Sequence, residues 1–300
     1  MIDVDGRGSL AGFTEKAVQV VEGQTGYLTR EKVKRLLRNP GFFPDGCRES
    51  VWRQILRLPS HMEEFKRLKE MGSLPRTKEL VQDYDNSRTI GIAFDALVHW
   101  HASLINCEWI VPLLSKISTI SRKPLFMFEV TMVLLSNWFG YWLSELPGPP
   151  PAVIARMDAT LSMINPRLGQ KLKSGLALWT PYRSFFAETL FERPWRCLMD
   201  NVVCEPPNFI EYLVIAYMDI NAVSIIEDEQ SFNSTHRAIL IGDLLKRARE
   251  IYQPFGRHFQ PIVEYPIYDA DAESVAFRSA QTEQDKIKAL RTELERQKEE

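Results

Sequence analysis

Apolar residues recur along most of this chain every three to four positions, the spacing that places them on one face of an α-helix. Val51, Trp52 and Ile55, for example, share one face of a helix predicted from Arg48 to Leu58. No stretch shows the alternation of apolar and polar residues that marks a half-buried strand. The pattern therefore predicts an all-α protein.

Proline, glycine and asparagine separate the periodic stretches, because these residues end helices or cap them. Thr29 is the expected N-cap of an early helix, and the polar residues 76–87 are predicted to lie outside any helix. The predicted helices cover residues 10–22, 29–38, 48–58, 62–71, 91–106, 112–120, 125–143, 152–164, 167–177, 181–191, 193–203, 207–218, 220–229 and 234–252.

The most apolar stretch, residues 125–143, is long enough to cross a bilayer. Glu129 and Asn137 lie inside it and Gly140 interrupts it, and a charge deep in lipid costs several kcal/mol. A buried central helix, in which Glu129 finds a hydrogen-bond partner, is the better interpretation. We expect no membrane span.

The helical pattern is lost over residues 253–272, and the composition then becomes strongly charged. Ile287, Leu290 and Leu294 form a narrow apolar stripe there. The stripe belongs either to a solvated terminal helix or to the start of a coiled coil, which would allow self-association.

The bulk composition is that of a globular protein with a substantial core: 45% of the residues are hydrophobic and 25% are charged. The formal net charge of −2 argues against a nucleic-acid partner. The four cysteines are scattered and are expected to be reduced thiols in an intracellular protein: Cys47, Cys107, Cys197 and Cys204. Since none is clustered with histidine, no metal site is expected. No cofactor motif, such as a glycine-rich phosphate loop, is present.

Several motifs together resemble the TBC domain, the fold that accelerates GTP hydrolysis by Rab proteins. The stretch FFPDGCRESVWRQILRLP resembles its opening, and its residues Gly46, Arg48, Val51 and Trp52 match the glycine, arginine and tryptophan pattern before a helix. LVHWHASL and ERPWRCLMDNV are similar to one WD-repeat-bearing member associated with centrosomes and cilia.

The resemblance implies a domain organisation and an architecture. Residues 1–28 would be an N-terminal helical extension, 29–265 a TBC-like domain of two helical lobes, and 266–300 a linker and the start of a charged coiled-coil helix. Family members of that kind carry a β-propeller upstream, and since nothing like a propeller is found, the chain is expected to be a fragment of a longer protein.

TBC domains place an arginine and a glutamine in the nucleotide site of the GTPase. Asp85, Arg88 and Thr89 reproduce the second half of the arginine motif, whereas Gln82 replaces its isoleucine. The arginine would neutralise charge on the transferring phosphoryl group, a contribution of about 10³–10⁵ in rate. The same residues also read as a turn followed by a helix start. Arg88 is therefore either a vestigial finger or a solvated, structural arginine.

The glutamine of that mechanism, which would orient the attacking water, has no counterpart, because no glutamine occurs between Arg88 and Gln170. The region where it is expected contains Asn106, Cys107, Glu108 and Trp109. Asparagine is one methylene shorter than glutamine, and a glutamate would bring negative charge toward the phosphate.

These observations predict a catalytically inactive, TBC-like protein-interaction scaffold, located in the cytoplasm at the centrosome, centriolar satellites or ciliary base. Its partners would be proteins of those structures and a small GTPase of the Rab type. Two alternatives remain. One is an active Rab GTPase-activating protein that uses Arg88 with the GTPase's own glutamine. The other is a Rab effector that binds without catalysis. An Arg88 buried in an ion pair with Asp83 or Asp85 would exclude the active alternative.

Overall fold

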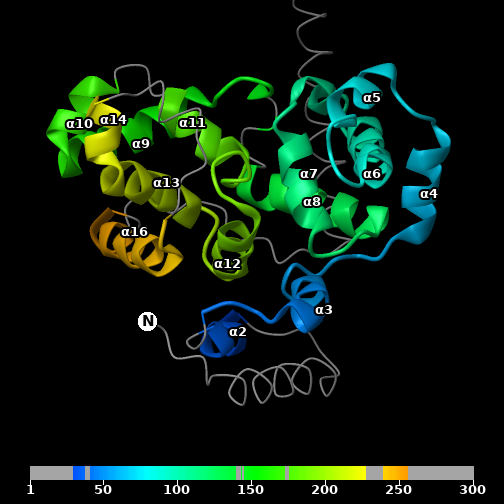
Figure 1. Ribbon diagram of the computed structural model, residues 1–300, viewed down its shortest axis with the longest axis horizontal. Coiled ribbons are helices and arrows are strands. Elements are labelled where there is room, and N and C mark those ends of the chain that lie inside the picture. Colours follow the sequence, from blue (N-terminus) through cyan, green and yellow to red (C-terminus); the bar gives the residue numbers. More distant parts are fainter. Residues whose placement is uncertain are drawn as a thin grey trace, which may run out of the picture. The chain divides into compact units, whose positions relative to one another are not determined.

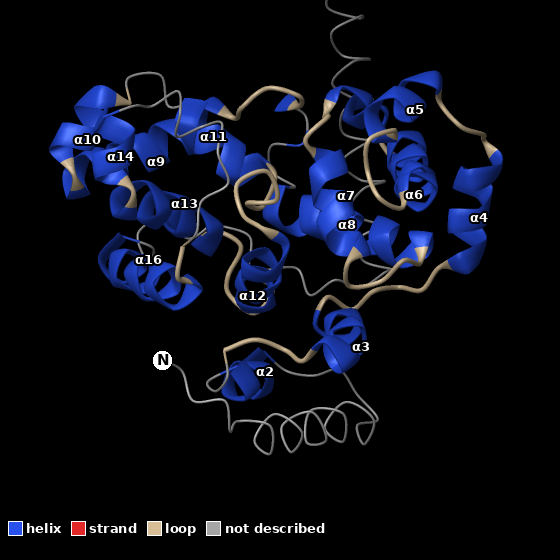
Figure 2. Ribbon diagram, viewed as in Figure 1, coloured by secondary structure: helices blue, strands red, loops and turns tan. Residues whose placement is uncertain are grey.

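The computed structural model describes residues 30–37, 41–139, 143, 145–172, 176–227 and 239–255, all of which belong to one unit, residues 1–265. This described part contains helices and no strand (Figure 2), as the periodicity predicts. The helices, labelled in Figure 1, are α2 (Arg30–Leu37), α3 (Asp45–Ile55), α4 (Met62–Glu70), α5 (Pro75–Val81), α6 (Ser87–Trp100), the 3₁₀ helix η1 (Ala102–Asn106), α7 (Ile110–Ser118), α8 (Pro124–Phe139), α9 (Pro151–Ile164), α10 (Pro166–Lys171), α11 (Leu176–Arg183), α12 (Glu192–Val202), α13 (Phe209–Ile220), α14 (Ala222–Glu227) and α16 (Ile241–Phe255).

Two groups of helices each surround an apolar central helix. In the first group, the apolar helix is α8, which is buried on nearly all sides. The α6 helix packs against α8 and also against α4, α5 and α7. In the second, α13 packs against α9, α11, α14 and α16, and every residue from Phe209 to Met218 is buried. A helix that is apolar all round is stable only at the centre of a core. The α12 helix contacts α2, α7 and α16 and so joins the two groups.

The stretch with membrane-like hydropathy forms one of these central helices, α8. Glu129 lies within it with 1% of its surface exposed, and its Oε1 accepts a hydrogen bond from the backbone N–H of His61 at 2.9 Å. Burial raises the pKa of this carboxyl. Within the described residues, no helix is both long and apolar enough to cross a membrane.

A buried polar network explains the arginine and tryptophan of the opening motif. Arg48 Nε lies 3.0 and 3.1 Å from the two carboxylate oxygens of Asp200, and Trp52 Nε1 donates to Asp200 at 2.9 Å. The backbone N–H of Phe43 donates to the same carboxylate at 2.8 Å. Asp200 is fully buried and belongs to α12, so α3 is anchored through its side chains to the helix that joins the two groups. Val51 adds a fully buried apolar contact on the same face of α3.

Some predicted boundaries differ from the observed ones. Residues 75–81 form α5, with proline at the first helical position, although the polar sequence predicted no helix there. The α6 helix begins at Ser87, because Asn86 adopts a left-handed conformation (φ 62°) and its C=O accepts the N–H groups of Thr89 and Ile90. The α11 helix ends at Arg183, where Phe185 and Phe186 take positive φ values. The predicted helix 10–22, the cap at Thr29 and the stripe of Ile287, Leu290 and Leu294 lie outside the described residues.

Candidate functional site

Arg88 lies in the first turn of α6, directly after the tight turn at Asn86. Its side chain is exposed, and within the described residues it forms no ion pair. Asp85 is also exposed and Thr89 is half-buried. The buried pair with Asp83 or Asp85 that would have excluded a finger role is therefore not formed.

A cleft of about 430 Å³ lies beside this turn. Tyr84, four residues before Arg88, lines one part of it, and Asn106, Glu108 and Trp109 line another. The two segments where the sequence places the arginine and glutamine fingers thus reach the same cleft, although Arg88 itself is not among its lining residues. The remaining lining residues are Leu80, Val111, Pro112, Pro147, Arg183 and Glu188.

Charged side chains in and around the cleft are already paired with one another. Arg183 at the end of α11 makes two parallel hydrogen bonds to Glu188, each 3.0 Å long, in the bidentate geometry that arginine prefers. Arg76 on α5 forms an ion pair with Glu108, and a second with Glu79 at 3.4 Å. Three carboxylates thus face two guanidinium groups. These five residues together leave no surplus positive charge for a phosphate, whereas Arg88, outside the lining, forms no ion pair among the described residues.

Three residues at the expected place of the glutamine finger line the cleft: the amide Asn106, the carboxylate Glu108 and the indole Trp109. Glu108 is 60% exposed and carries a carboxylate, which accepts hydrogen bonds but cannot donate one when ionised. Trp109 follows it, 4% exposed, and packs edge-on against Phe139 with ring centroids 6.3 Å apart.

Burial raises the pKa of the Tyr84 phenol, and the nearby carboxylates Glu188 and Asp83 raise it further. Tyr84 is therefore a neutral hydrogen-bonding group at physiological pH. No group of histidine, cysteine, aspartate and glutamate side chains that would hold a metal ion occurs in the portion of the chain that the structure describes.

Sequence reasoning missed Arg76, Arg183 and Glu188. Arg76 lies on α5, which the pattern did not predict, so the direction of its side chain was unknown. Arg183 and Glu188 come from a segment far along the chain, and only the tertiary fold brings them to Glu108. No signal in the sequence marks these two residues.

Comparison with solved structures identifies the fold. The crystal structure of the Chlamydomonas flagellar RabGAP TBC domain matches with a TM-score of 0.55 and 13% identity, over 83% of this chain and 91% of that one. The Ypt/Rab-GAP domain of Gyp1p matches with a TM-score of 0.61 and 9% identity, over 83% of this chain and 99% of that one. The protein therefore has the TBC-domain fold.

Sequence comparison points to one kind of TBC protein. The chain is similar to proteins named TBC1 domain family member 31, with 25% identity to that of Xenopus tropicalis over 81% of this chain and 26% to that of Bos taurus over 81%. The human protein is 25% identical over 80% of this chain. The chain spans about a quarter of the length of these relatives. No protein-family model matches it.

Proposed function

We propose that this TBC domain does not accelerate GTP hydrolysis and serves as a protein-interaction scaffold. The observation that carries the proposal is the cleft between Tyr84 and Glu108, in which Arg183 is paired with Glu188, while Arg76, outside the lining, is paired with Glu108. No glutamine is among the described residues that line this cleft; Asn106, one methylene shorter, lines it together with the carboxylate of Glu108.

The sizes of two electrostatic effects support the proposal that the domain does not accelerate GTP hydrolysis. An arginine finger contributes about 10³–10⁵ in rate, which corresponds to roughly 4–7 kcal/mol of transition-state stabilisation. A carboxylate about 4 Å from a phosphate oxygen repels it by about 4 kcal/mol per unit charge at an effective dielectric constant of about 20. Even with Arg88 in place, Glu108 at the γ-phosphate would offset part of that gain, an amount that its ion pair with Arg76 and its exposure to solvent reduce.

A scaffold role at the centrosome or ciliary base extends the proposal. It is supported by the motifs LVHWHASL and ERPWRCLMDNV, which resemble a TBC protein associated with centrosomes and cilia. One structural neighbour is a flagellar RabGAP, which is compatible with a ciliary setting. Co-localisation of the tagged protein with a centriolar marker tests it, and a uniform cytosolic distribution in ciliated and dividing cells would contradict it.

The catalytic part is tested by single-turnover GTP hydrolysis against a panel of Rab proteins. The expected result is no stimulation, and the same rates for the wild type, Arg88→Ala and the matched control Arg67→Ala, which removes an exposed arginine on α4. A stimulation of about 100-fold that Arg88→Ala abolishes and Arg67→Ala leaves intact would refute the proposal.

One observation favours the active alternative enough to keep it in the test. Arg88 is exposed and forms no ion pair among the described residues, so it is free to reach a GTPase that supplies its own glutamine. The effector alternative is separated by pull-down with GTP-loaded and GDP-loaded Rab proteins. A pure scaffold shows no preference between the two nucleotide states, whereas an effector prefers GTP.

A further inference from the structure

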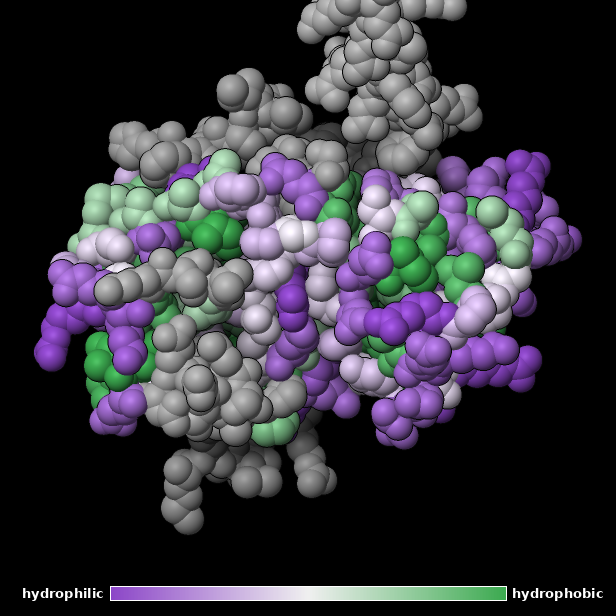
Figure 3. All heavy atoms as spheres, turned by 90° about the horizontal axis from the view of Figure 1, so that it is seen from above, coloured by the Kyte–Doolittle hydropathy of each residue, from purple (hydrophilic) through white to green (hydrophobic). Residues whose placement is uncertain are grey.

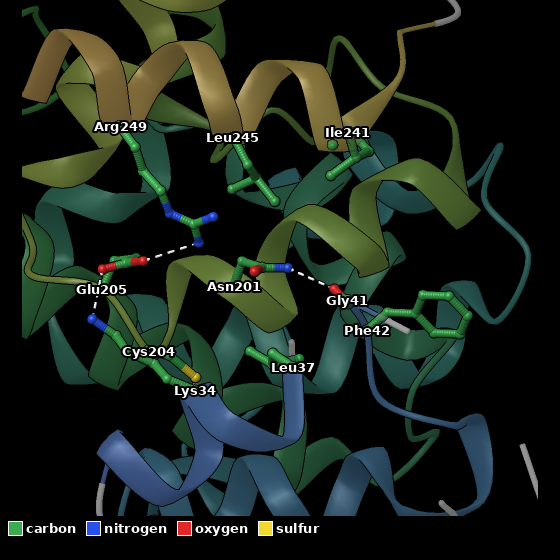
Figure 4. Close-up of a pocket in the computed structure, with 11 residues that line it drawn as sticks. Lys34, Leu37, Gly41, Phe42, Asn201, Cys204, Glu205, Ile241, Leu245 and Arg249 are labelled. Carbon is green, nitrogen blue, oxygen red and sulfur yellow. Dashed lines mark hydrogen bonds and ion pairs between the residues drawn. The ribbon is translucent and has the colours of Figure 1, made fainter. Parts of the chain in front are cut away.

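A second and larger groove lies between α2, α12 and α16. It has a volume of about 640 Å³, within the range of roughly 300–1,000 Å³ that is typical of ligand pockets. Figure 4 shows α16 along one side, α2 along the other and the end of α12 between them. Lys34, Gly242 and Arg249 on its rim are exposed, so the groove is open to solvent.

The groove has a positively charged side. Glu205 accepts from Lys34 Nζ at 2.7 Å and from Arg249 Nη2 at 3.2 Å, so one carboxylate bridges two cations (Figure 4). Glu205 is 13% exposed, whereas Lys34 and Arg249 are 43% and 50% exposed. Lysine carries three N–H donors and arginine five, so both retain donors that face solvent. The cluster carries one surplus positive charge.

The other side of the groove is apolar. Leu37 on α2 and Leu245 on α16 form its floor, each only 7% exposed. Phe42 and Ile241 are half-buried and lie away from the charged residues in Figure 4. Partly exposed apolar side chains next to an apolar floor gain free energy when a second apolar group covers them. A ligand that matches both sides therefore carries a negative charge beside apolar groups.

The wall formed by Gly41 and Phe42 is held in place before any ligand arrives. Asn201 Nδ2 donates to the C=O of Gly41 at 2.8 Å. The backbone N–H of Phe43, the residue after Phe42, donates to the carboxylate of Asp200. Gly41 has a φ of +88°, which a residue with a side chain rarely adopts. Among the described residues, no backbone hydrogen bond involves the N–H or C=O of Phe42. A fixed strip of backbone with an available donor and acceptor suits an extended peptide.

From these features we infer that the groove binds an extended segment of a partner protein, in which a glutamate or aspartate is flanked by large apolar side chains. The carboxylate pairs with Lys34 and Arg249, and the apolar side chains cover Phe42 and Ile241 above the floor of the groove. In an extended peptide, residues two apart point to the same side, so apolar residues two positions from the acidic one reach these apolar side chains. The groove shares no lining residue with the cleft beside Arg88, so the inference holds whether or not the domain stimulates GTP hydrolysis.

The test is a fluorescence-anisotropy titration of the purified chain with the labelled peptide Ser-Leu-Ser-Glu-Ser-Leu-Ser, whose symmetry makes its direction unimportant. Two control peptides replace the glutamate by glutamine, or both leucines by alanine. We expect each control to bind about tenfold more weakly, a difference of about 1.4 kcal/mol. Arg249→Glu should weaken binding of the glutamate peptide by a similar factor and should improve binding of a peptide with lysine in its place. Arg67→Glu, the same change on α4 outside the groove, should leave the affinity unchanged.

Circular dichroism and thermal unfolding of the Arg249→Glu protein provide the folding control, since an exposed ion pair contributes little to stability. Equal binding of the glutamate and glutamine peptides, or equal weakening by Arg249→Glu and Arg67→Glu, would overturn the inference. So would absence of peptide binding. If, in that case, sedimentation shows self-association that Arg249→Glu abolishes, the occupant is a second copy of the chain; if anionic vesicles bind instead, it is a membrane.

Discussion

Removal of Asp200 leaves a buried guanidinium without this partner, whereas removal of Arg48 leaves a buried carboxyl group without it. The two variants should therefore lose different amounts of stability. In Asp200→Ala, the indole N–H of Trp52 and the backbone N–H of Phe43 lose their acceptor. Arg48 loses its buried carboxylate partner but keeps Asp45 and the C=O of Phe43. Arginine keeps its proton at any ordinary pH, so the charge stays buried. Removal of one partner from a buried pair costs about 3–5 kcal/mol. Two further donors are left unsatisfied, but Asp45 still compensates part of the Arg48 charge, so we expect Asp200→Ala to fall within that range.

Arg48→Met leaves a carboxyl group instead, and a carboxyl can take up a proton. Burial raises the pKa of Asp200 to about 6, although Arg48 and the N–H donors lower it. Without Arg48 the pKa rises further. Because the folded-state pKa then exceeds that of the unfolded chain, the contribution of this carboxyl to stability is fully present at low pH and is lost as the pH rises through the folded-state pKa. The destabilisation by Arg48→Met should therefore shrink as the pH is lowered from about 8 to about 5, whereas that by Asp200→Ala should not.

Urea unfolding followed by far-UV circular dichroism measures both effects, as the free energy of unfolding relative to wild type at each pH. Arg53→Met is the matched control on the same helix, because Arg53 pairs with Glu49 near the surface at 3.1 Å and should contribute about 1 kcal/mol or less. If Asp200→Ala costs less than about 1 kcal/mol, the network does not anchor α3. If Arg48→Met shows no recovery at low pH, the account of the Asp200 pKa is wrong.

Three further predictions concern stability and assembly. Gly169→Ala should lower the free energy of unfolding in urea by about 1–3 kcal/mol, because its Cβ would lie 2.8 Å from Ser162 Cα. In the control Gly46→Ala, the Cβ meets no atom within 4 Å, so the free energy of unfolding should rise by up to about 1 kcal/mol. Burial raises the pKa of Glu129 above its usual 4.5, so this residue's contribution to stability is fully present below that pH and is lost as the pH rises through the folded-state pKa. Glu129→Gln should therefore gain stability relative to wild type as the pH rises, and the gain should vanish below the usual pKa. If the C-terminal stripe is a coiled coil, Leu290→Glu should reduce self-association measured by sedimentation velocity, and an unchanged association state would contradict it.

The sequence predicts the helical class well because apolar periodicity and burial coincide over most of the chain. It fails at α5, where only Thr77 and Val81 are buried and the helix lacks an apolar stripe. Propensity and a proline at the first position are weaker signals than periodicity. It also sets the start of the following helix too late, because the left-handed turn at Asn86 depends on a backbone conformation that composition does not reveal.

The candidate site is predictable only in part. Local motifs identify Arg88 and the Asn106–Trp109 segment, and the fold brings the turn before Arg88 and that segment to one cleft. Asp200, the partner of Arg48, lies within a stretch that resembles the TBC family, but its role requires the contact between α3 and α12. The pairing of Arg183 with Glu188 and of Arg76 with Glu108 depends on tertiary packing, which no local pattern encodes.

Fold and chemistry are separable in this domain because they depend on residues in different environments. Arg48, Trp52 and Asp200 are buried and mutually hydrogen-bonded, so each substitution among them costs stability. Arg88 and Glu108 are exposed, and a substitution at either leaves the core unchanged. Exposed positions usually tolerate replacement within about 0.5 kcal/mol, whereas buried network positions do not. The exposed residues of the candidate site can therefore change without loss of the TBC-domain fold, which is what the proposed loss of catalysis requires.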